Sequence, residues 1–88
     1  MIVTTAQYTV STTAVKVIAT NDVGRQVNIH CIGNDAVYLG PTSAVTTSTG
    51  FHLDKNAAVF QIELDANDEL WAISTTGSQT VTTMQITL

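Results

Sequence analysis

Charge is the feature that this sequence has least of. Asp, Glu, Lys and Arg make up 11% of its 88 residues, against about 25% in an ordinary soluble domain. The three basic residues, Lys16, Arg25 and Lys55, are spread along the chain, and the formal net charge is −4. A surface that binds phosphates needs clustered Lys or Arg to displace counterions. The sequence therefore argues against a nucleic-acid partner.

Cysteine and long apolar runs are also scarce. Cys31 is the only cysteine, so the chain can form no internal disulfide and has no Cys-x-x-Cys metal pair. No apolar run approaches the roughly 20 residues of a membrane-spanning helix. The first residues, "MIVTTAQYTV", lack the basic start and long apolar stretch of a signal peptide. We expect a protein with no membrane partner that is made in a cytoplasm.

Catalytic signatures are missing as well. The two histidines are too few for a zinc site, which normally has three or four protein ligands. No serine lies in a G-x-S-x-G elbow, and no glycine-rich loop leads into a helix that could hold phosphate. His30 and Cys31 are adjacent, but neighbours in a strand point to opposite faces and cannot form a dyad. We predict no catalytic residue, cofactor-binding residue, cofactor or metal ligand, and a protein that is not an enzyme.

The acidic group "LDANDEL" permits two interpretations. Asp65, Asp68 and Glu69 could offer the clustered oxygens that a hard cation such as calcium binds in a loop. The EF-hand spacing and its glycine are absent, however. A tight acidic turn between two strands explains the same residues, and this is the favoured interpretation.

What the sequence does contain is threonine, sixteen times, and an alternation of apolar and polar residues with period two. Short turn signals rich in Gly, Asn and Asp separate the alternating runs. This pattern predicts an all-β chain: a single small antiparallel β-sandwich or jelly-roll-like barrel of about seven or eight short strands, forming one domain over residues 1–88. The inward faces are expected to include Val27, Ile29, Cys31, Phe60, Ile62, Leu64, Met84, Ile86 and Leu88.

Two features of the predicted strands bear on function. In "ELWAIS", Trp71 shares one face of the strand with Glu69 and Ile73, while Leu70 and Ala72 share the other. We expect Trp71 in the core; the alternative is an outward-facing interface anchor. In "VYLGPTSAVTTSTGFHL", Gly40-Pro41 ends a strand and Val45 is expected to anchor the hydroxyl-rich run that follows. We interpret this stretch as a connection between the two sheets.

A resemblance supplies a function. "VYLGPTSAVTTSTGFHLDKN", followed by "VFQIEL" and "ELWAIS", resembles a pattern of small tailed-bacteriophage virion proteins: capsid decoration (cement) proteins and the β-sandwich domains of phage head fibres. It covers roughly residues 26–88 and contains no catalytic signature. It implies a jelly-roll-like homotrimer in the virion, bound to the outside of the head, that stabilises the shell by bridging subunits of the major capsid protein.

The expected capsid contact is the N-terminal segment. Residues 1–7 read as an N-terminal arm or an edge strand, which could add to a partner sheet. The residues assigned to the capsid contact are Met1, Ile2, Val3, Thr4 and Thr5.

Two alternatives to decoration remain open. The first is a phage fibre-head or receptor-binding β domain that binds host glycan through Tyr8, Tyr38 and Trp71. The second, less favoured, is a cupin-like metal enzyme, which would need convergent histidine and carboxylate ligands.

Overall fold

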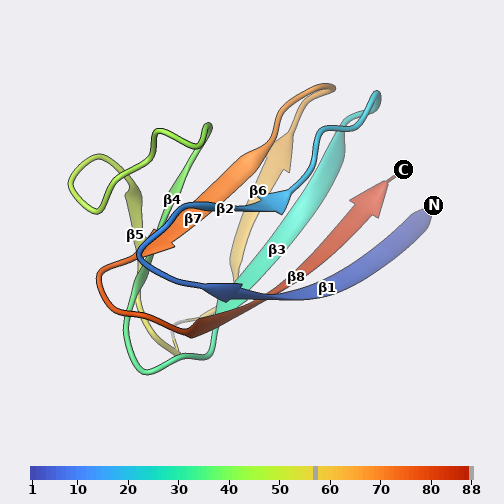
Figure 1. Ribbon diagram of the computed structural model, residues 1–88. Helices are drawn as coiled ribbons and strands as arrows, with labels where there is room; N and C mark the ends of the chain where they lie inside the picture. Colours follow the sequence, from blue (N-terminus) through green and yellow to red (C-terminus); the bar gives the residue numbers. More distant parts are fainter. Residues whose placement is uncertain (57, 88) are drawn as a thin grey trace.

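The computed structural model describes residues 1–56 and 58–87, and these residues form eight strands and no helix (Figure 1). The strands pair into two antiparallel sheets of four: sheet A, in the order β1-β8-β3-β6, and sheet B, in the order β2-β7-β4-β5. The predicted all-β sandwich is confirmed. The strands are β1 (Ile2–Val10), β2 (Val15–Ile18), β3 (Arg25–Cys31), β4 (Val37–Gly40), β5 (Phe51–Leu53), β6 (Phe60–Leu64), β7 (Leu70–Ser74) and β8 (Gln79–Thr87).

The order of the strands is that of a jelly roll. Consecutive strands lie in opposite sheets, with the single exception of β4 and β5, which pair as a hairpin within sheet B. Each sheet is therefore assembled from strands that are distant in the sequence, and eight strands joined in this way form a double-sheet jelly roll. Figure 1 shows β1 and β8 side by side, with the start of β1 beside the end of β8.

The core lies between the two sheets. Val27 and Ile29 are fully buried and Cys31 is 1% exposed, as the alternation of β3 predicted. The half-buried Phe60 and Ile62 pack against the core from β6, also as predicted. The rest of the buried apolar cluster consists of Val10, Val17, Ile18, Val37, Leu39, Leu53, Leu64, Leu70, Ala72 and Val81.

The predicted orientation of β8 was wrong. Val81 and Thr83 point into the core with 0% and 4% exposure, whereas Met84 is 40% exposed on the outer face of sheet A, and Ile86 shares that face. Both faces of β8 carry apolar side chains, so the alternation could be assigned either way. The position that we predicted for Leu88 lies outside the described residues. Thr83 Oγ1 is the one buried side-chain polar atom in the described residues that has no hydrogen-bond partner.

The prediction that the stretch from residue 37 to residue 53 connects the two sheets was also wrong. β4 and β5 are neighbours in sheet B, where Val37 pairs with Leu53. The loop between them folds back onto its own sheet, and the buried Val45 side chain packs against Gly40. A Cβ atom on residue 40 would lie only 2.5 Å from Val45 Cγ2, so this contact requires glycine. Val45 is thus the predicted anchor, but of a wide hairpin.

A buried arginine closes one end of the sandwich. Arg25 begins β3, is only 4% exposed, and points inward together with Val27. Its Nη2 donates to the carbonyl oxygens of Ala19, at 2.7 Å, and Asp68, at 2.6 Å. Five donors in a fixed planar fork allow one guanidinium to hold several acceptors. Further hydrogen bonds go to the carbonyl oxygens of Val23 and Asp65 and to Oε1 of Gln85.

A buried glutamine closes the opposite end. Gln79 is 3% exposed, and its Oε1 accepts a hydrogen bond from the backbone N–H of Asp35 at 2.9 Å. Its Nε2 donates to Thr76 Oγ1 at 3.0 Å and to the carbonyl oxygen of Gly77 at 3.2 Å. One side chain therefore joins the β3–β4 loop to the β7–β8 turn.

Candidate functional site: the interaction surfaces

The sandwich has two open sides, each formed by the edge strand of one sheet beside the edge strand of the other. β1 and β2 border one side, and β5 and β6 border the other. Four apolar side chains pack against the core without being fully buried: Tyr8 and Val15 on the first side, Phe60 and Ile62 on the second. An edge strand also presents unpaired backbone groups, which makes it a site for pairing with another chain.

The side bordered by β5 and β6 contains an apolar groove of about 530 Å³. β5 has only three residues, so it covers little of the inward face of β6. Phe51 remains 57% exposed and lies against Phe60, with 5.1 Å between the ring centroids. Asp68 and Glu69 are the charged residues of the lining. The other lining residues are Leu39, Gly40, Pro41, Ile62, Leu64 and Leu70.

The side bordered by β1 and β2 is different in charge. Residues 1–20 contain one charged side chain, Lys16, whereas residues 51–69 contain five acidic residues and one lysine. At the end of β1, Met1, Ile2 and Val3 are 86%, 64% and 52% exposed. The two open sides are therefore unlike. One is acidic with an apolar groove; the edge strands of the other, β1 and β2, contain no acidic residue, and β1 carries an exposed apolar end.

The predicted contact segment is an edge strand and not a free arm. Ile2 to Thr5 belong to β1, where Ile2 pairs with Thr87 and Thr5 with Met84, and all are exposed together with Met1. Their exposure leaves them available to a partner. Which partner they contact stays a prediction.

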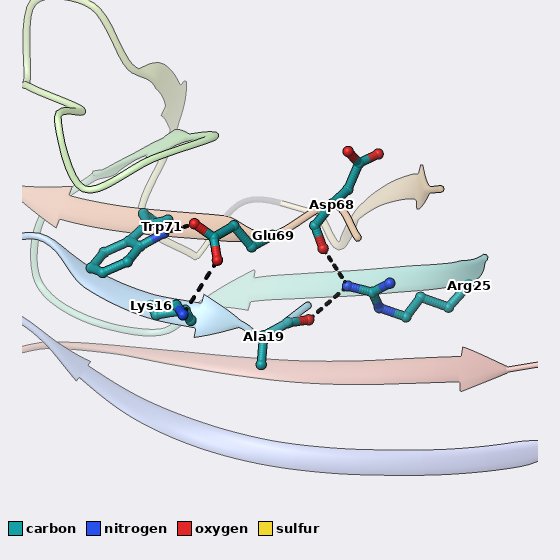
Figure 2. Close-up of polar contacts among 6 residues, drawn as sticks. All are labelled: Lys16, Ala19, Arg25, Asp68, Glu69 and Trp71. Carbon is teal, nitrogen blue, oxygen red and sulfur yellow. Dashed lines mark hydrogen bonds and ion pairs between the residues drawn. The ribbon is translucent and has the colours of Figure 1, made fainter. Parts of the chain in front are cut away.

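The outer face of sheet B carries a unit of three side chains, one from β2, one from β7 and one from the residue just before β7, shown in Figure 2. Lys16 Nζ lies 3.3 Å from Glu69 Oε2 and 5.4 Å from the centroid of the Trp71 ring. The indole N–H of Trp71 donates to Glu69 Oε1 at 2.9 Å. The indole hydrogen bond, followed by the hydrogen bond and charge of Lys16, lowers the pKa of Glu69 below its ordinary value.

The prediction that Trp71 lies in the core was therefore wrong. Leu70 and Ala72 occupy the core face of β7, which leaves Trp71 half-buried on the outside. The Lys16 ammonium lies over the Trp71 ring, and the indole N–H, the only hydrogen-bond donor of the side chain, is bound to Glu69. These contacts orient the indole on the sheet and leave it no free hydrogen-bond donor.

The aromatic residues considered for glycan binding do not meet. Tyr8 packs against the core from sheet A, whereas Tyr38 and Trp71 lie on the outer face of sheet B. Tyr38 neighbours His52, with ring centroids 5.1 Å apart, and His52 lies 3.3 Å from the Asp54 carboxylate. These contacts are exposed and form no common aromatic platform.

The acidic segment 65–68 is a tight turn between β6 and β7. The Asp68 carboxylate accepts a hydrogen bond from the Asp65 N–H at 3.0 Å, and Asn67 adopts a left-handed backbone with φ of 68°. Within residues 1–56 and 58–87, no group of three or more His, Cys, Asp or Glu is arranged to hold a metal ion. The same residues include no helix that could span a membrane.

The outer face of sheet A has a second, broader groove of about 890 Å³. The inverted orientation of β8 places Met84 and Ile86 in it, among uncharged amide and hydroxyl side chains such as Gln26, Asn28 and Gln61. This surface was not predicted, because the alternation in β8 was interpreted as placing Met84 and Ile86 in the core.

The described residues form a small jelly-roll sandwich with two unlike open sides and a groove on the outer face of sheet A. No known protein family and no curated protein matches the chain. A solved structure from the disulfide-linked pili that form endospore appendages in Bacillus is similar to it, with a TM-score of 0.65 and 18% sequence identity. The match covers 98% of this chain and 85% of that one. At this identity the likeness shows a shared fold.

The resemblance to phage decoration proteins was wrong as a guide to function. The structural likeness is to a pilus protein, and nothing among the comparisons supports a capsid partner, a decoration trimer, a fibre-head domain or a location in the virion. The residues that suggested the phage family are β4 to β7 of the jelly roll together with their turns. Such a pattern specifies a fold that many unrelated functions share.

Proposed function

We propose that this chain is a structural, non-enzymatic subunit that polymerises with copies of itself into a fibre on the outside of a cell or spore. The observation that carries the proposal is the pair of unlike open sides, one acidic with an apolar groove and one whose edge strands, β1 and β2, contain no acidic residue. The likeness in fold to a pilus protein over 98% of the chain supports it.

Unlike sides favour an open polymer over a closed dimer. A two-fold dimer places the same surface of each copy in contact, so one formed by the β5–β6 side would oppose acidic residues to acidic residues. Contact between the β5–β6 side of one copy and the β1–β2 side of the next avoids this repulsion. Such a head-to-tail contact leaves a free side at each end, and repetition of it gives a ring or a filament.

The low charge of the chain suits burial in a polymer. Thr, Ser, Asn and Gln supply most of its polar surface, and neutral groups lose less free energy than ions when an interface removes them from water. The exposed Phe51 provides the large apolar side chain that such an interface uses as an anchor.

The proposed polymer differs in one respect from the disulfide-linked pili. Cys31 is 1% exposed, and its thiol lies 3.4 Å from the carbonyl oxygen of Asp35 inside the core. A disulfide between two copies through Cys31 would require the sandwich to open. We therefore propose that contacts between copies of this sequence are noncovalent.

The test is the assembly state of the purified protein. Negative-stain electron microscopy and analytical ultracentrifugation should show filaments or rings that grow with protein concentration. Phe51→Lys should leave a folded monomer with an unchanged melting temperature. Val23→Lys is the matched control, because Val23 is also an exposed apolar residue, at 42% exposure, but lies in the β2–β3 loop; it should polymerise. A monomer at every concentration, or a Phe51→Lys variant that still polymerises, contradicts the proposal.

A further inference from the structure

We infer that the apolar groove beside β6 is the docking site for β1 of a second copy, with Ile2, Thr4 and Ala6 of that copy facing Leu64, Ile62 and Phe60. This inference rests on the proposed function and specifies the strands and the register of the contact. It follows from the direction of the edge strands, the register of sheet A, the sizes of the facing side chains and their charges.

The direction of the strands permits the contact. Sheet A has four strands, and all its neighbours are antiparallel, so its two edge strands, β1 and β6, run in opposite directions. A second copy placed in the same orientation beside the first therefore presents its β1 antiparallel to β6. The two sheets can then continue as one antiparallel sheet through main-chain hydrogen bonds.

The register of sheet A identifies the residues that meet. Thr4 pairs with Gln85, Gln85 with Val27, and Val27 with Ile62, so Thr4 and Ile62 occupy the same row at opposite edges. Ala6 and Phe60 are related in the same way through Thr83 and Ile29. A copy added without a shift along the strands therefore places Thr4 beside Ile62 and Ala6 beside Phe60.

The side chains in these rows are complementary in size. β6 contributes the half-buried Phe60 and Ile62, which form part of the groove, and β1 contributes the small Ala6 and Thr4. Small beside large is the combination that interdigitates in a packed interface. One row further on, the 64% exposed Ile2 meets the Leu64 end of the groove and gains burial that it lacks within its own copy.

Charge fixes which surface of the second copy enters. The groove is bordered by Asp68 and Glu69, and Glu63 lies on the outer face of β6. β1 contains no charged residue, and the first twenty residues contain no acidic one. An incoming β1 therefore brings no negative charge to an acidic surface, whereas an incoming β6 would bring Glu63 and the neighbouring acidic turn.

Cysteine pairs test the register directly. Thr5 and Gln61 share a row on the outer face of sheet A, through Met84 and Asn28, and both are exposed. Within one copy they are separated by three strand spacings, about 14 Å, too far for a disulfide. In a Cys31→Ala background, Thr5→Cys combined with Gln61→Cys should form a covalent ladder on mild oxidation. Thr4→Cys with Gln61→Cys is the control, because a shift of one residue reverses the face.

The outcomes separate this inference from the proposed function. Fibres with a ladder from the Thr5–Gln61 pair, at least tenfold more abundant than from the Thr4–Gln61 pair, support both. Fibres without that ladder, or with equal ladders from both pairs, overturn the inference and leave the proposed function standing. A covalent dimer from Gln61→Cys alone shows that β6 meets β6 and also overturns it. The absence of fibres and of any ladder overturns both.

Discussion

Arg25 donates a hydrogen bond from Nη2 to the carbonyl oxygen of Asp68 across 2.6 Å, and no side-chain carboxylate of the described residues pairs with it (Figure 2). The same nitrogen binds the carbonyl oxygen of Ala19, so one buried guanidinium joins the segment before β3 to the turn before β7. These two segments are separated by more than forty residues in the chain. The charge of Arg25 therefore organises the end of the sandwich instead of binding a ligand.

Replacement of Arg25 should destabilise the fold. Arg25→Met keeps most of the aliphatic length but leaves the carbonyl oxygens of Ala19 and Asp68 without their donor, which we expect to lower the free energy of unfolding by about 2–4 kcal/mol. Urea denaturation followed by far-UV circular dichroism measures the change. Lys55→Met is the control: it removes the same charge from an exposed position and should change stability by less than about 0.5 kcal/mol. Equal effects of the two variants would show that Arg25 acts only through net charge.

Removal of the unpaired hydroxyl of Thr83 should stabilise the protein. Thr83 is 4% exposed and its Oγ1 has no partner among the described residues. Thr83→Val retains the branched shape and replaces the buried polar group by a methyl, so we expect a gain of about 1 kcal/mol in the free energy of unfolding. That gain corresponds to a melting temperature higher by about 4–8 °C for a domain of this size.

The control for this substitution lies on the same strand. Thr80 points to the outer face of β8 and is half-buried. Thr80→Val makes the same chemical change without removing a buried unpaired group, so stability should change by less than about 0.5 kcal/mol. A Thr83→Val variant no more stable than Thr80→Val would indicate that the Thr83 hydroxyl is hydrated in solution.

The contrast between β3 and β8 shows how far local sequence could lead. In β3 the apolar residues all lie on one face, which also carries Arg25, and the other face is polar. The alternation therefore predicted correctly that Val27, Ile29 and Cys31 are buried. In β8 both faces carry apolar residues, and only packing against sheet B decides that Val81 is inside. A period of two predicts that a segment is a strand. It predicts which face of the strand is buried only when the other face is polar.

The surfaces proposed for assembly could not be predicted from local sequence patterns, for a related reason. Whether β1 or β6 is an edge strand depends on the order of the whole sheet, in which β8 is inserted between β1 and β3. That order is set by pairings between residues far apart in the chain. The role of Arg25 was equally hidden, because its partners are mostly backbone carbonyls, which leave no mark in the sequence.

The thiol of Cys31 should be unreactive in the folded protein. Its burial in the core against Val27 and Ile29 excludes a bulky reagent, so Ellman's reagent should modify it about a hundredfold or more slowly than an exposed cysteine, at a rate set by opening of the sandwich. Ser43→Cys in a Cys31→Ala background is the exposed control. We also expect no covalent multimers of the unmodified chain on a nonreducing gel. Rapid modification of Cys31, or a disulfide-linked ladder, would contradict a noncovalent assembly.

The Glu69 carboxyl should couple stability to acidic pH. Its pKa is lowered in the folded protein, chiefly by the hydrogen bond from the Trp71 indole and then by Lys16. Folding therefore favours the ionised form. The resulting stabilisation is fully present above the pKa of the unfolded chain, about 4.3, and is lost as the pH falls through the lower pKa of the folded protein. Nuclear magnetic resonance titration of the Glu69 side chain measures the folded value.

Two substitutions separate the causes of this shift. Trp71→Phe keeps an aromatic ring but removes the indole donor, so the pKa of Glu69 should rise toward its ordinary value. Lys16→Met removes both a hydrogen bond and a charge that lower the pKa of Glu69, so this variant should raise that pKa as well. The loss of stability between pH 5 and pH 3 should be shallower in Trp71→Phe than in the unmodified protein, since less linkage remains. An unchanged pKa in Trp71→Phe would mean that the 2.9 Å contact between Trp71 and Glu69 does not persist in solution.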